Sequence, residues 1–157
     1  MRKRLITATA EAIGTRGEGW LDIERAAVVE VTSEEGDYPI ESAFGPADAR
    51  GWRAAEPGSQ TIRLVFDQPQ QLSCISLAFE ENEAARTQEF VLRWSQGQGS
   101  PVKEIVRQQW NFSPPGSTLE TEDYQVELSG VTQIELKIVP DRSSGDAYAS
   151  LAQFRVA

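Results

Sequence analysis

The chain has 157 residues, a length that suits one domain with its own core and leaves too little for two. Apolar residues make up 39% and charged residues 25%, which is typical of a soluble folded protein and excludes a disordered or membrane-embedded one. The chain has no histidine, and Cys74 is its one cysteine. This composition excludes serine and cysteine hydrolase triads, histidine-based metal sites, cysteine-cluster metal sites and internal disulfides.

The net charge of −9 is unevenly distributed along the chain. Residues 1–17 hold four basic residues and one acidic residue, whereas residues 18–157 hold 11 basic and 23 acidic residues, a net charge of −12. An acidic body repels phosphate backbones and anionic lipid surfaces. We therefore expect neither nucleic acid nor a membrane as the main partner.

Residues 1–17 form a basic leader, which we expect to be a short helix or disordered, ahead of a single domain at residues 18–157. Three basic residues followed by residues 5–10 resemble the start of a secretory signal, but the apolar stretch is short and Glu11 interrupts it. No run reaches the roughly 20 apolar residues that a membrane-spanning helix needs. A cytoplasmic location is expected ahead of secretion.

After the leader, short segments of alternating apolar and polar residues are separated by turns rich in glycine, proline and aspartate. Alternation with period two is typical of strands with one buried face, and no long helical pattern lies between the segments. About eight strands are expected, in chain order at residues 26–32, 61–66, 72–79, 89–95, 102–110, 124–128, 132–139 and 149–156. Strands joined by turns predict an all-β fold, an antiparallel β-sandwich of the jelly-roll type.

Alternation also predicts which side chains form the core, because residues two apart on a strand share one face. The expected core residues are Val29, Val31, Leu64, Phe66, Leu77, Leu92, Trp94, Leu136, Ile138 and Leu151. Trp52 follows a long loop and is expected to pack under it.

The order of these segments resembles the discoidin, or coagulation-factor type C, family of galactose-binding-like jelly rolls, which includes many carbohydrate-binding modules. The residues that carry the resemblance are the first strand ending at 31–34, the loop 43–52 (Ala-Phe-Gly-Pro-Ala-Asp-Ala-Arg-Gly-Trp), strands 62–66 and 72–79, and segments 90–95 and 149–154. The resemblance covers about residues 20–157. It implies a jelly-roll fold and a ligand held by loops at one end.

The same resemblance raises the question of calcium, since acidic and carbonyl groups in that family often hold a structural calcium ion. This chain departs from the family pattern: Ser42, Gly45, Pro46 and Ala47 stand where the family has Asn, Asp, Gly and Asp, and Gln153 stands at the place of its glutamate. Only Asp48 remains nearby as a charged ligand. Calcium takes six to eight oxygen ligands, usually with carboxylates among them, so no metal and no cofactor are expected.

The segment 51–62 is also similar to one stretch of the amino-terminal domain of a DNA single-strand-break repair scaffold, a relative of the same fold. Shared architecture explains the similarity, and the net charge of −12 on residues 18–157 argues against DNA binding.

The segment 110–115 is the most distinctive candidate for a ligand site. Trp110 and Phe112 offer aromatic faces beside Asn111, an amide that both donates and accepts, which is the combination that recognition of vicinal hydroxyls needs. Arg53 supplies a fork of donors, and Tyr148 lies beside a loop. The alternatives are that Trp110 and Phe112 plug the end of the sandwich, that Arg53 pairs with Glu56, and that Tyr148 is a half-buried cap.

These observations predict a non-catalytic, glycan-recognising module that binds its ligand through Trp110, Asn111, Phe112, Arg53 and Tyr148. An adaptor for a protein partner, built on the same fold, is the alternative, and binding of DNA ends ranks third. The charged run 80–83 is interpreted as a solvated turn. The sequence does not identify the sugar or the oligomeric state.

Overall fold

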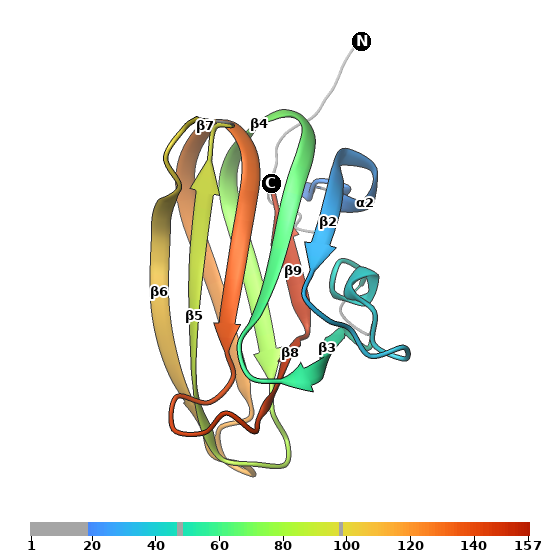
Figure 1. The fold of residues 1–157 in the computed structure, drawn as a ribbon, viewed down its shortest axis with the longest axis vertical. Helices are drawn as coiled ribbons and strands as arrows, with labels where there is room; N and C mark the ends of the chain where they lie inside the picture. The colour runs from blue at the N-terminus through green and yellow to red at the C-terminus, as the bar shows by residue number, and fades with distance from the viewer. Residues whose placement is uncertain (1–18, 47–48, 98) are drawn as a thin grey trace.

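A computed structural model describes residues 19–46, 49–97 and 99–157 (Figure 1). Most of these residues lie in β-strands. The predicted leader 1–17 lies outside these residues. The elements are α2 (Ile23–Ala26), β2 (Ala27–Val31), the 3-10 helix η1 (Ile40–Ala43), β3 (Trp52–Pro57), β4 (Gln60–Glu80), β5 (Arg86–Ser95), β6 (Lys103–Phe112), β7 (Leu119–Val139), β8 (Tyr148–Leu151) and β9 (Gln153–Val156). No helix in the described part of the chain is long and apolar enough to cross a membrane.

Two long strands, β4 and β7, run through both layers of a sandwich (Figure 1). The first half of β4 pairs with the second half of β7, from Gln60↔Ile138 to Val65↔Gln133, and the second half of β4 pairs with the first half of β7 up to Glu80↔Leu119. The register shifts between Val65 and Cys74, where both strands bend over the same end of the molecule. The sequence predicts two strands in each of these stretches, and the structure joins each pair into one bent strand.

The remaining strands complete two antiparallel layers. A five-stranded layer has the order β2-β4-β7-β5-β6, whereas β9 pairs with the second half of β4 to form a three-stranded layer with the first half of β7. A separate antiparallel pair, β3 and β8, lies beside them. The prediction of an all-β antiparallel sandwich with about eight strands is confirmed.

The core lies between the two layers and follows the predicted alternation. Seven of the ten expected core residues are buried: Leu64, Phe66, Leu77, Leu92, Leu136, Ile138 and Leu151. Val29, Val31 and Trp94 are partly buried and pack against that cluster. Trp94 keeps one face toward solvent near the end of β5, where the ammonium group of Lys103 lies 5.5 Å from its ring. The rings of Phe79 and Phe90 stack across the layers at 5.1 Å.

Strand β3 is an element that the sequence does not predict. Its residues are rich in alanine and end in proline, so they lack the β-branched and aromatic side chains that signal a strand. Pairing of Trp52 with Leu151 and of Arg53 with Ser150 holds β3 against β8. Trp52 is 1% exposed and its indole Nε1 donates to the carbonyl oxygen of Ser33 at 3.0 Å, which confirms it as a core residue.

Gly51 sets the close approach of β3 to β8, and its replacement tests that contact. Its φ of +79° is left-handed, and an added Cβ would lie 2.7 Å from the carbonyl oxygen of Leu151. We expect Gly51→Ala to lower the free energy of unfolding by about 2–3 kcal/mol, because backbone strain and a steric clash act together. Urea denaturation measures the change. Gly36→Ala is the control, since nothing lies within 4 Å of its added Cβ, and an equal loss there would contradict the prediction.

Candidate functional site

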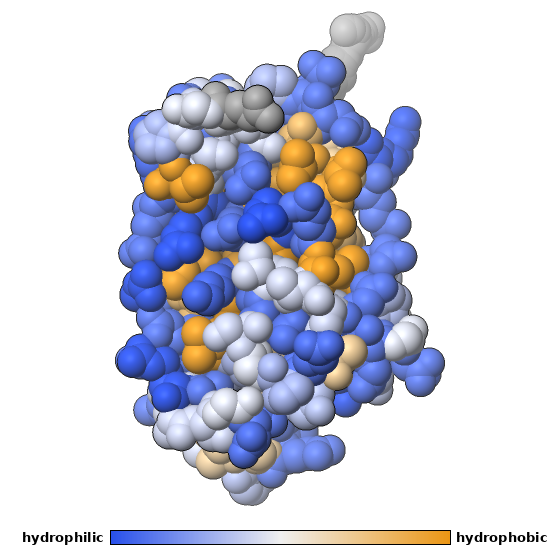
Figure 2. Space-filling view, in the orientation of Figure 1, coloured by the Kyte–Doolittle hydropathy of each residue, from blue (hydrophilic) through white to orange (hydrophobic). Residues whose placement is uncertain are grey.

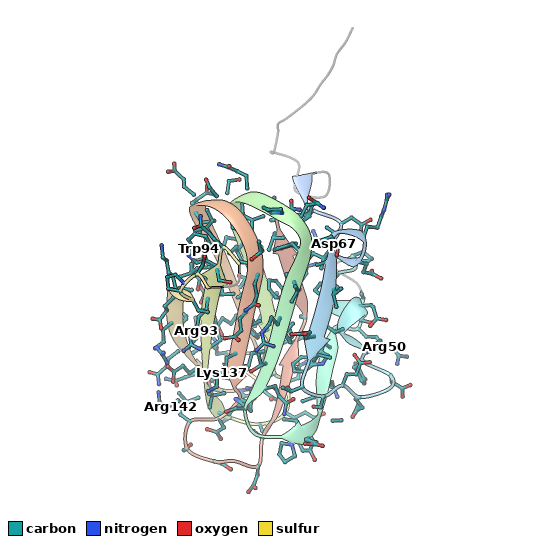
Figure 3. The ribbon with its side chains drawn as sticks, turned by 45° about the horizontal axis from the view of Figure 1, so that its top comes forward. Arg50, Asp67, Arg93, Trp94, Lys137 and Arg142 are labelled. Carbon is teal, nitrogen blue, oxygen red and sulfur yellow. The ribbon has the colours of Figure 1, made fainter. Side chains whose placement is uncertain are left out.

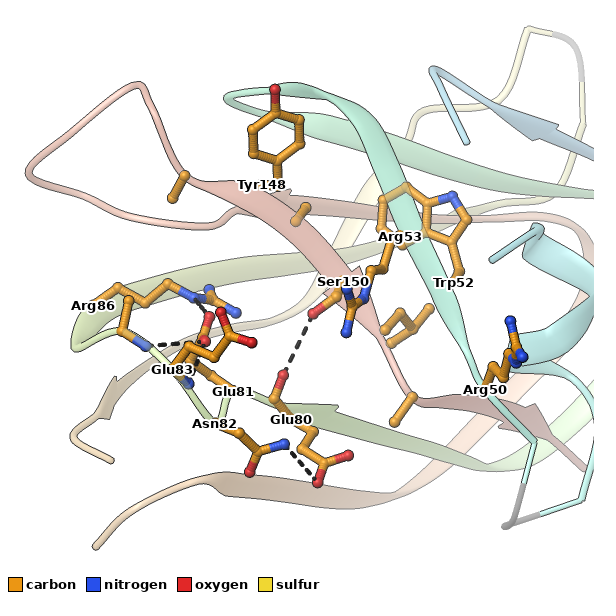
Figure 4. Close-up of a pocket in the computed structure, with 15 residues that line it drawn as sticks. Arg50, Trp52, Arg53, Glu80, Glu81, Asn82, Glu83, Arg86, Tyr148 and Ser150 are labelled. Atoms are coloured by element: carbon orange, nitrogen blue, oxygen red, sulfur yellow. Dashed lines mark hydrogen bonds and ion pairs between the residues drawn. The ribbon is translucent and has the colours of Figure 1, made fainter. Parts of the chain in front are cut away.

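A pocket of about 350 Å³ opens at the end of the sandwich opposite the bends of β4 and β7 (Figure 4). Three segments that lie far apart in the sequence line it, namely residues 50–53 before and in β3, residues 80–86 between β4 and β5, and residues 147–152 in and beside β8. We call it the end pocket. Its lining contains three arginines and three glutamates, so it presents charged donors and acceptors together.

Arg53 is fixed on one wall of the end pocket. Its backbone N–H donates to the carbonyl oxygen of Tyr38 at 3.1 Å, and its carbonyl oxygen accepts from the N–H of Glu35 at 2.9 Å. Its guanidinium carbon lies 4.3 Å from the centroid of the Tyr38 ring, and that of Arg50 lies 5.7 Å from the same centroid. A cation over an aromatic face is attracted by the ring, so Tyr38 orders both arginines.

Arg86 forms the deeper wall, and its side chain is 3% exposed. Its Nε donates to Glu81 at 2.6 Å, its Nη1 donates to the carbonyl oxygen of Pro140 at 2.7 Å and to Gln88 at 3.1 Å, and its guanidinium carbon lies 4.8 Å from the centroid of the Phe112 ring. Burial acts to raise the pKa of Glu81, but bonds from Arg86 and from the backbone N–H groups of residues 83 and 84 outweigh it and lower that pKa. Glu81 is therefore an ionised partner of Arg86.

The rim of the end pocket carries hydrogen-bonded polar groups and one aromatic ring. Asn82 Nδ2 donates to the carboxylate of Glu80 at 3.2 Å, and the hydroxyl of Ser150 lies 3.5 Å from the carbonyl oxygen of Glu80. Tyr148 is 54% exposed and projects from the start of β8 (Figure 4). An exposed aromatic face beside donors and acceptors is a surface on which a polar ring compound can bind.

Two of the five predicted site residues, Arg53 and Tyr148, meet in the end pocket. In the described part of the chain no ion pair joins Arg53 to Glu56, so the alternative of a loop-anchoring pair is not seen. Tyr148 is exposed rather than a half-buried cap. That either residue binds a ligand stays a prediction.

The predicted platform of Trp110, Asn111 and Phe112 does not form, because β6 continues through Phe112 instead of ending at Trp110. Successive strand residues point to opposite faces, so Trp110 and Phe112 turn inward while Asn111 turns outward. Phe112 is 1% exposed and lies under Arg86, which corrects its place among the ligand contacts. Trp110 packs against the core, and the side-chain Oδ1 of Asn111 accepts from the hydroxyl of Thr87 at 2.8 Å.

The sequence analysis did not place the run 80–83 at the site. From the sequence, Tyr38 is a weaker binding candidate or a half-buried cap, and the structure shows it half-buried, outside the pocket lining and against Arg53. The run was interpreted as a solvated turn, and its lining role depends on β8 lying beside it. For the run 80–83 the sequence does offer a signal. The run directly follows a predicted strand, and it lies at the same end of the sandwich as the segment that contains Trp52. No sequence signal indicates that the ring of Tyr38 lies under Arg53.

Beneath the end pocket lies a buried acid, Glu120, which is 1% exposed. One carboxylate oxygen accepts from Gln88 at 3.4 Å and the other has no hydrogen-bond partner. Burial raises the pKa of Glu120 to about 8, Glu122 adds to the rise, and Gln88 and Arg86 oppose it. The carboxyl group is therefore protonated at neutral pH. Burial and the same two acids raise the pKa of Tyr124 as well.

Of the residues at the place of the family's calcium site, the described ones include a carbonyl group that is already bonded to a cation. Nη2 of Arg155 donates to the carbonyl oxygen of Gly45 at 3.2 Å, so a cationic side chain already bonds to this loop. Ala47 and Asp48 lie outside the described residues. Among the residues described, no group of three acidic, cysteine or histidine side chains could hold a metal ion.

Comparison with known proteins finds similarity in fold. No protein-family model and no curated protein sequence matches the chain. The family 32 carbohydrate-binding module of NanJ from Clostridium perfringens, solved with galactose, matches at a TM-score of 0.61 and 14% identity over 87% of this chain and 96% of that one. A second C. perfringens module, CpGH89CBM32-5 in complex with GalNAc-β-1,3-galactose, matches at a TM-score of 0.60 and 19% identity, over 88% of this chain and 99% of that one.

A third solved structure is the family 32 module of AlyQ in complex with 4,5-unsaturated mannuronic acid. It matches at a TM-score of 0.53 and 17% identity, over 84% of this chain and 95% of that one. This chain therefore shares the fold of the family 32 carbohydrate-binding modules, as the galactose-binding-like resemblance predicts.

The pKa of Glu120 predicts how stability depends on pH. The folded state keeps a proton up to about pH 8 that the unfolded chain loses near pH 4.5, so the free energy of unfolding should fall as the pH rises through that interval. Glu120→Gln, a neutral replacement of similar shape, should remove this fall and unfold at a higher temperature than the wild type at pH 8.5. Thermal melts from pH 4 to 9 measure both proteins. Parallel curves for the two would contradict the prediction.

The contact of Arg155 with Gly45 predicts that the fold does not depend on calcium. A chelator should leave the melting temperature unchanged, and Arg155→Gln should lower the free energy of unfolding by about 1 kcal/mol, because a hydrogen bond from a charged group is lost. Added calcium should not restore the variant. A calcium-dependent rise of several degrees in the wild type would show that the loop does hold the ion.

Proposed function

We propose that this chain is a non-catalytic module that binds a glycan in the end pocket. The observation that carries the proposal is the lining of this pocket. Arg53, Asn82 and Glu80 line this pocket together with Tyr148, whose exposed ring projects from the start of β8 at the rim (Figure 4). A pyranose offers an apolar C–H face and a ring of hydroxyls, and it needs these two kinds of surface together.

The end pocket is also held in shape before any ligand arrives, which supports binding. Arg53 is stacked on Tyr38, Glu81 is bonded to Arg86 and to two backbone N–H groups, and Asn82 is bonded to Glu80. Side chains that are already ordered lose little conformational entropy when a ligand binds. A shallow site for a sugar needs this property, because it buries little apolar area.

The fold neighbours support the same proposal. Those modules were solved in complex with galactose, GalNAc-β-1,3-galactose and 4,5-unsaturated mannuronic acid. A fold hosts more than one function, so the proposal depends on the lining of the pocket and takes the neighbours as support.

The proposal is for binding without catalysis. A glycosidase needs a pair of carboxyl groups placed on either side of one glycosidic bond. The buried acid at this end of the molecule, Glu120, does not line the end pocket.

Glycan recognition is proposed ahead of the adaptor alternative because the large apolar side chains that are exposed among the described residues lie on different elements. Val28 lies on β2, Val102 precedes β6, Leu119 begins β7 and Tyr148 begins β8. On the face shown in Figure 2, apolar groups are separated by hydrophilic ones. A docking surface for a protein partner normally needs a continuous apolar patch of several hundred Å².

A glycan array probed with the full chain identifies ligands, and two aromatic variants then locate the site. Tyr148→Ala should weaken binding about tenfold, because the exposed stacking face is lost, and should leave the melting temperature unchanged. Trp110→Ala should lower the free energy of unfolding by about 3 kcal/mol and leave affinity unchanged, because its ring packs against the core.

Calorimetric titration and thermal melts on both variants separate the two roles. Loss of affinity in Trp110→Ala with an intact fold would return the site to β6. An array without any bound glycan would contradict the proposed function.

A further inference from the structure

We propose that the glycan preferred by the end pocket carries a carboxylate, as a uronic acid does, and that Arg53 binds this carboxylate with Arg50 beside it. The inference rests on the proposed function and names its ligand class. It starts from the distribution of ion pairs in an acidic protein.

Exposed arginines in this chain have many carboxylates available to them, since 24 acidic residues face 15 basic ones. The ion pairs among the described residues use Arg63, Arg86, Arg93, Arg107 and Arg142. At the end pocket, Arg86 is committed to Glu81, whereas Arg50 and Arg53 have no carboxylate within ion-pair distance among the residues described. Within the described part of the chain, the end pocket is therefore lined by two guanidinium groups that form no ion pair.

Arg53 is also oriented in a way that leaves its donors available. Its guanidinium carbon lies 4.3 Å from the centroid of the Tyr38 ring, and its backbone is bonded on both sides to the turn 35–38. The ring attracts the cation without accepting from it as a carboxylate would, and among the described residues no hydrogen bond engages the guanidinium N–H groups, which leaves these donors for another partner. A planar fork of N–H groups matches the two oxygens of a carboxylate, and such a pair is stronger than a neutral hydrogen bond.

Acidic side chains on the side of the end pocket opposite the arginines disfavour a second negative charge on the ligand. Glu80 and Glu83 stand there with the amide of Asn82, on the turn after β4 (Figure 4). Carboxylate oxygens accept from sugar hydroxyls but repel a second anionic group. A sugar ring with a carboxylate on one side and hydroxyls on the other satisfies both walls, whereas a phosphate dianion does not.

The test compares ligands that differ only in this charge. Oligomers of galacturonate, mannuronate and glucuronate are titrated into the full chain beside their methyl esters, which keep each ring and cap each carboxylate. We expect at least one acid to bind about tenfold or more tightly than its ester, with an affinity that falls as salt rises.

Arg53→Gln should remove most of this preference and leave the melting temperature unchanged, since the residue is exposed. Lys137→Gln is the matched control, because it removes the same charge from the face of the five-stranded layer (Figure 3). Arg53→Lys should restore only part of the affinity, because an ammonium keeps the charge and loses the fork.

Each contrary result has a distinct meaning. Equal affinity for acid and ester, or a preference that Arg53→Gln leaves intact, overturns this inference while the proposed function stands. Tighter binding of a sulfated galactan oligomer than of every uronate overturns it in favour of a sulfate ester. If none of the acids or esters binds, the inference fails, and an empty array in addition refutes the proposed function.

Discussion

The antiparallel pairing of β4 with β7 is the interaction on which the rest of the structure depends. Both strands pass from one layer to the other, so a single pair of strands, with register shifts at the bend, sets the pairing in both layers. Exposed Pro69 lies in the bend of β4, and Gly130, with a φ of +65°, lies in the bend of β7. Since both bends lie at one end of the sandwich, the end of β4 and the start of β7 lie next to each other at the opposite end. The end pocket exists because of this arrangement.

The parts of this structure that the sequence predicts are those that depend on neighbouring residues. Alternation along residues 61–66 and 132–139 identifies both strands and their buried faces, because a strand's period of two is a local property. The same rule explains the error at residues 110–112. Once β6 is taken to end at Phe112, Trp110 and Asn111 must point to opposite faces and cannot form one platform. The boundary of a strand is set by its partner, here β5, which alternation alone does not show.

Contacts between segments that lie far apart in the sequence could not be predicted, because they depend on how the whole chain folds. The stacking of Arg53 on Tyr38 requires the turn 35–38 to lie beside β3, and β3 itself is held by β8 almost a hundred residues later in the chain. Arg53 and Tyr148 were singled out for their chemistry alone. Their meeting in one pocket depends on the β3–β8 pair, which no local pattern announces because β3 lacks strand-forming residues.

The buried groups under the end pocket form a balanced set. Arg86 and Glu81 cancel as an ion pair, and Glu120 remains uncharged below about pH 8, so the cluster adds no net charge to the interior. An isolated buried charge would be costly, and here burial itself prevents Glu120 from ionising.

The separation between this buried cluster and the exposed rim has a consequence for how such a module diversifies. Arg86 contacts both the pocket and the core, so its replacement would disturb packing as well as recognition. Arg50, Arg53 and Tyr148 are exposed and carry little of the core. Under the proposed function, sequence change at these three positions therefore alters ligand choice while the sandwich stays folded. One scaffold can in this way acquire a series of specificities through changes on a single rim.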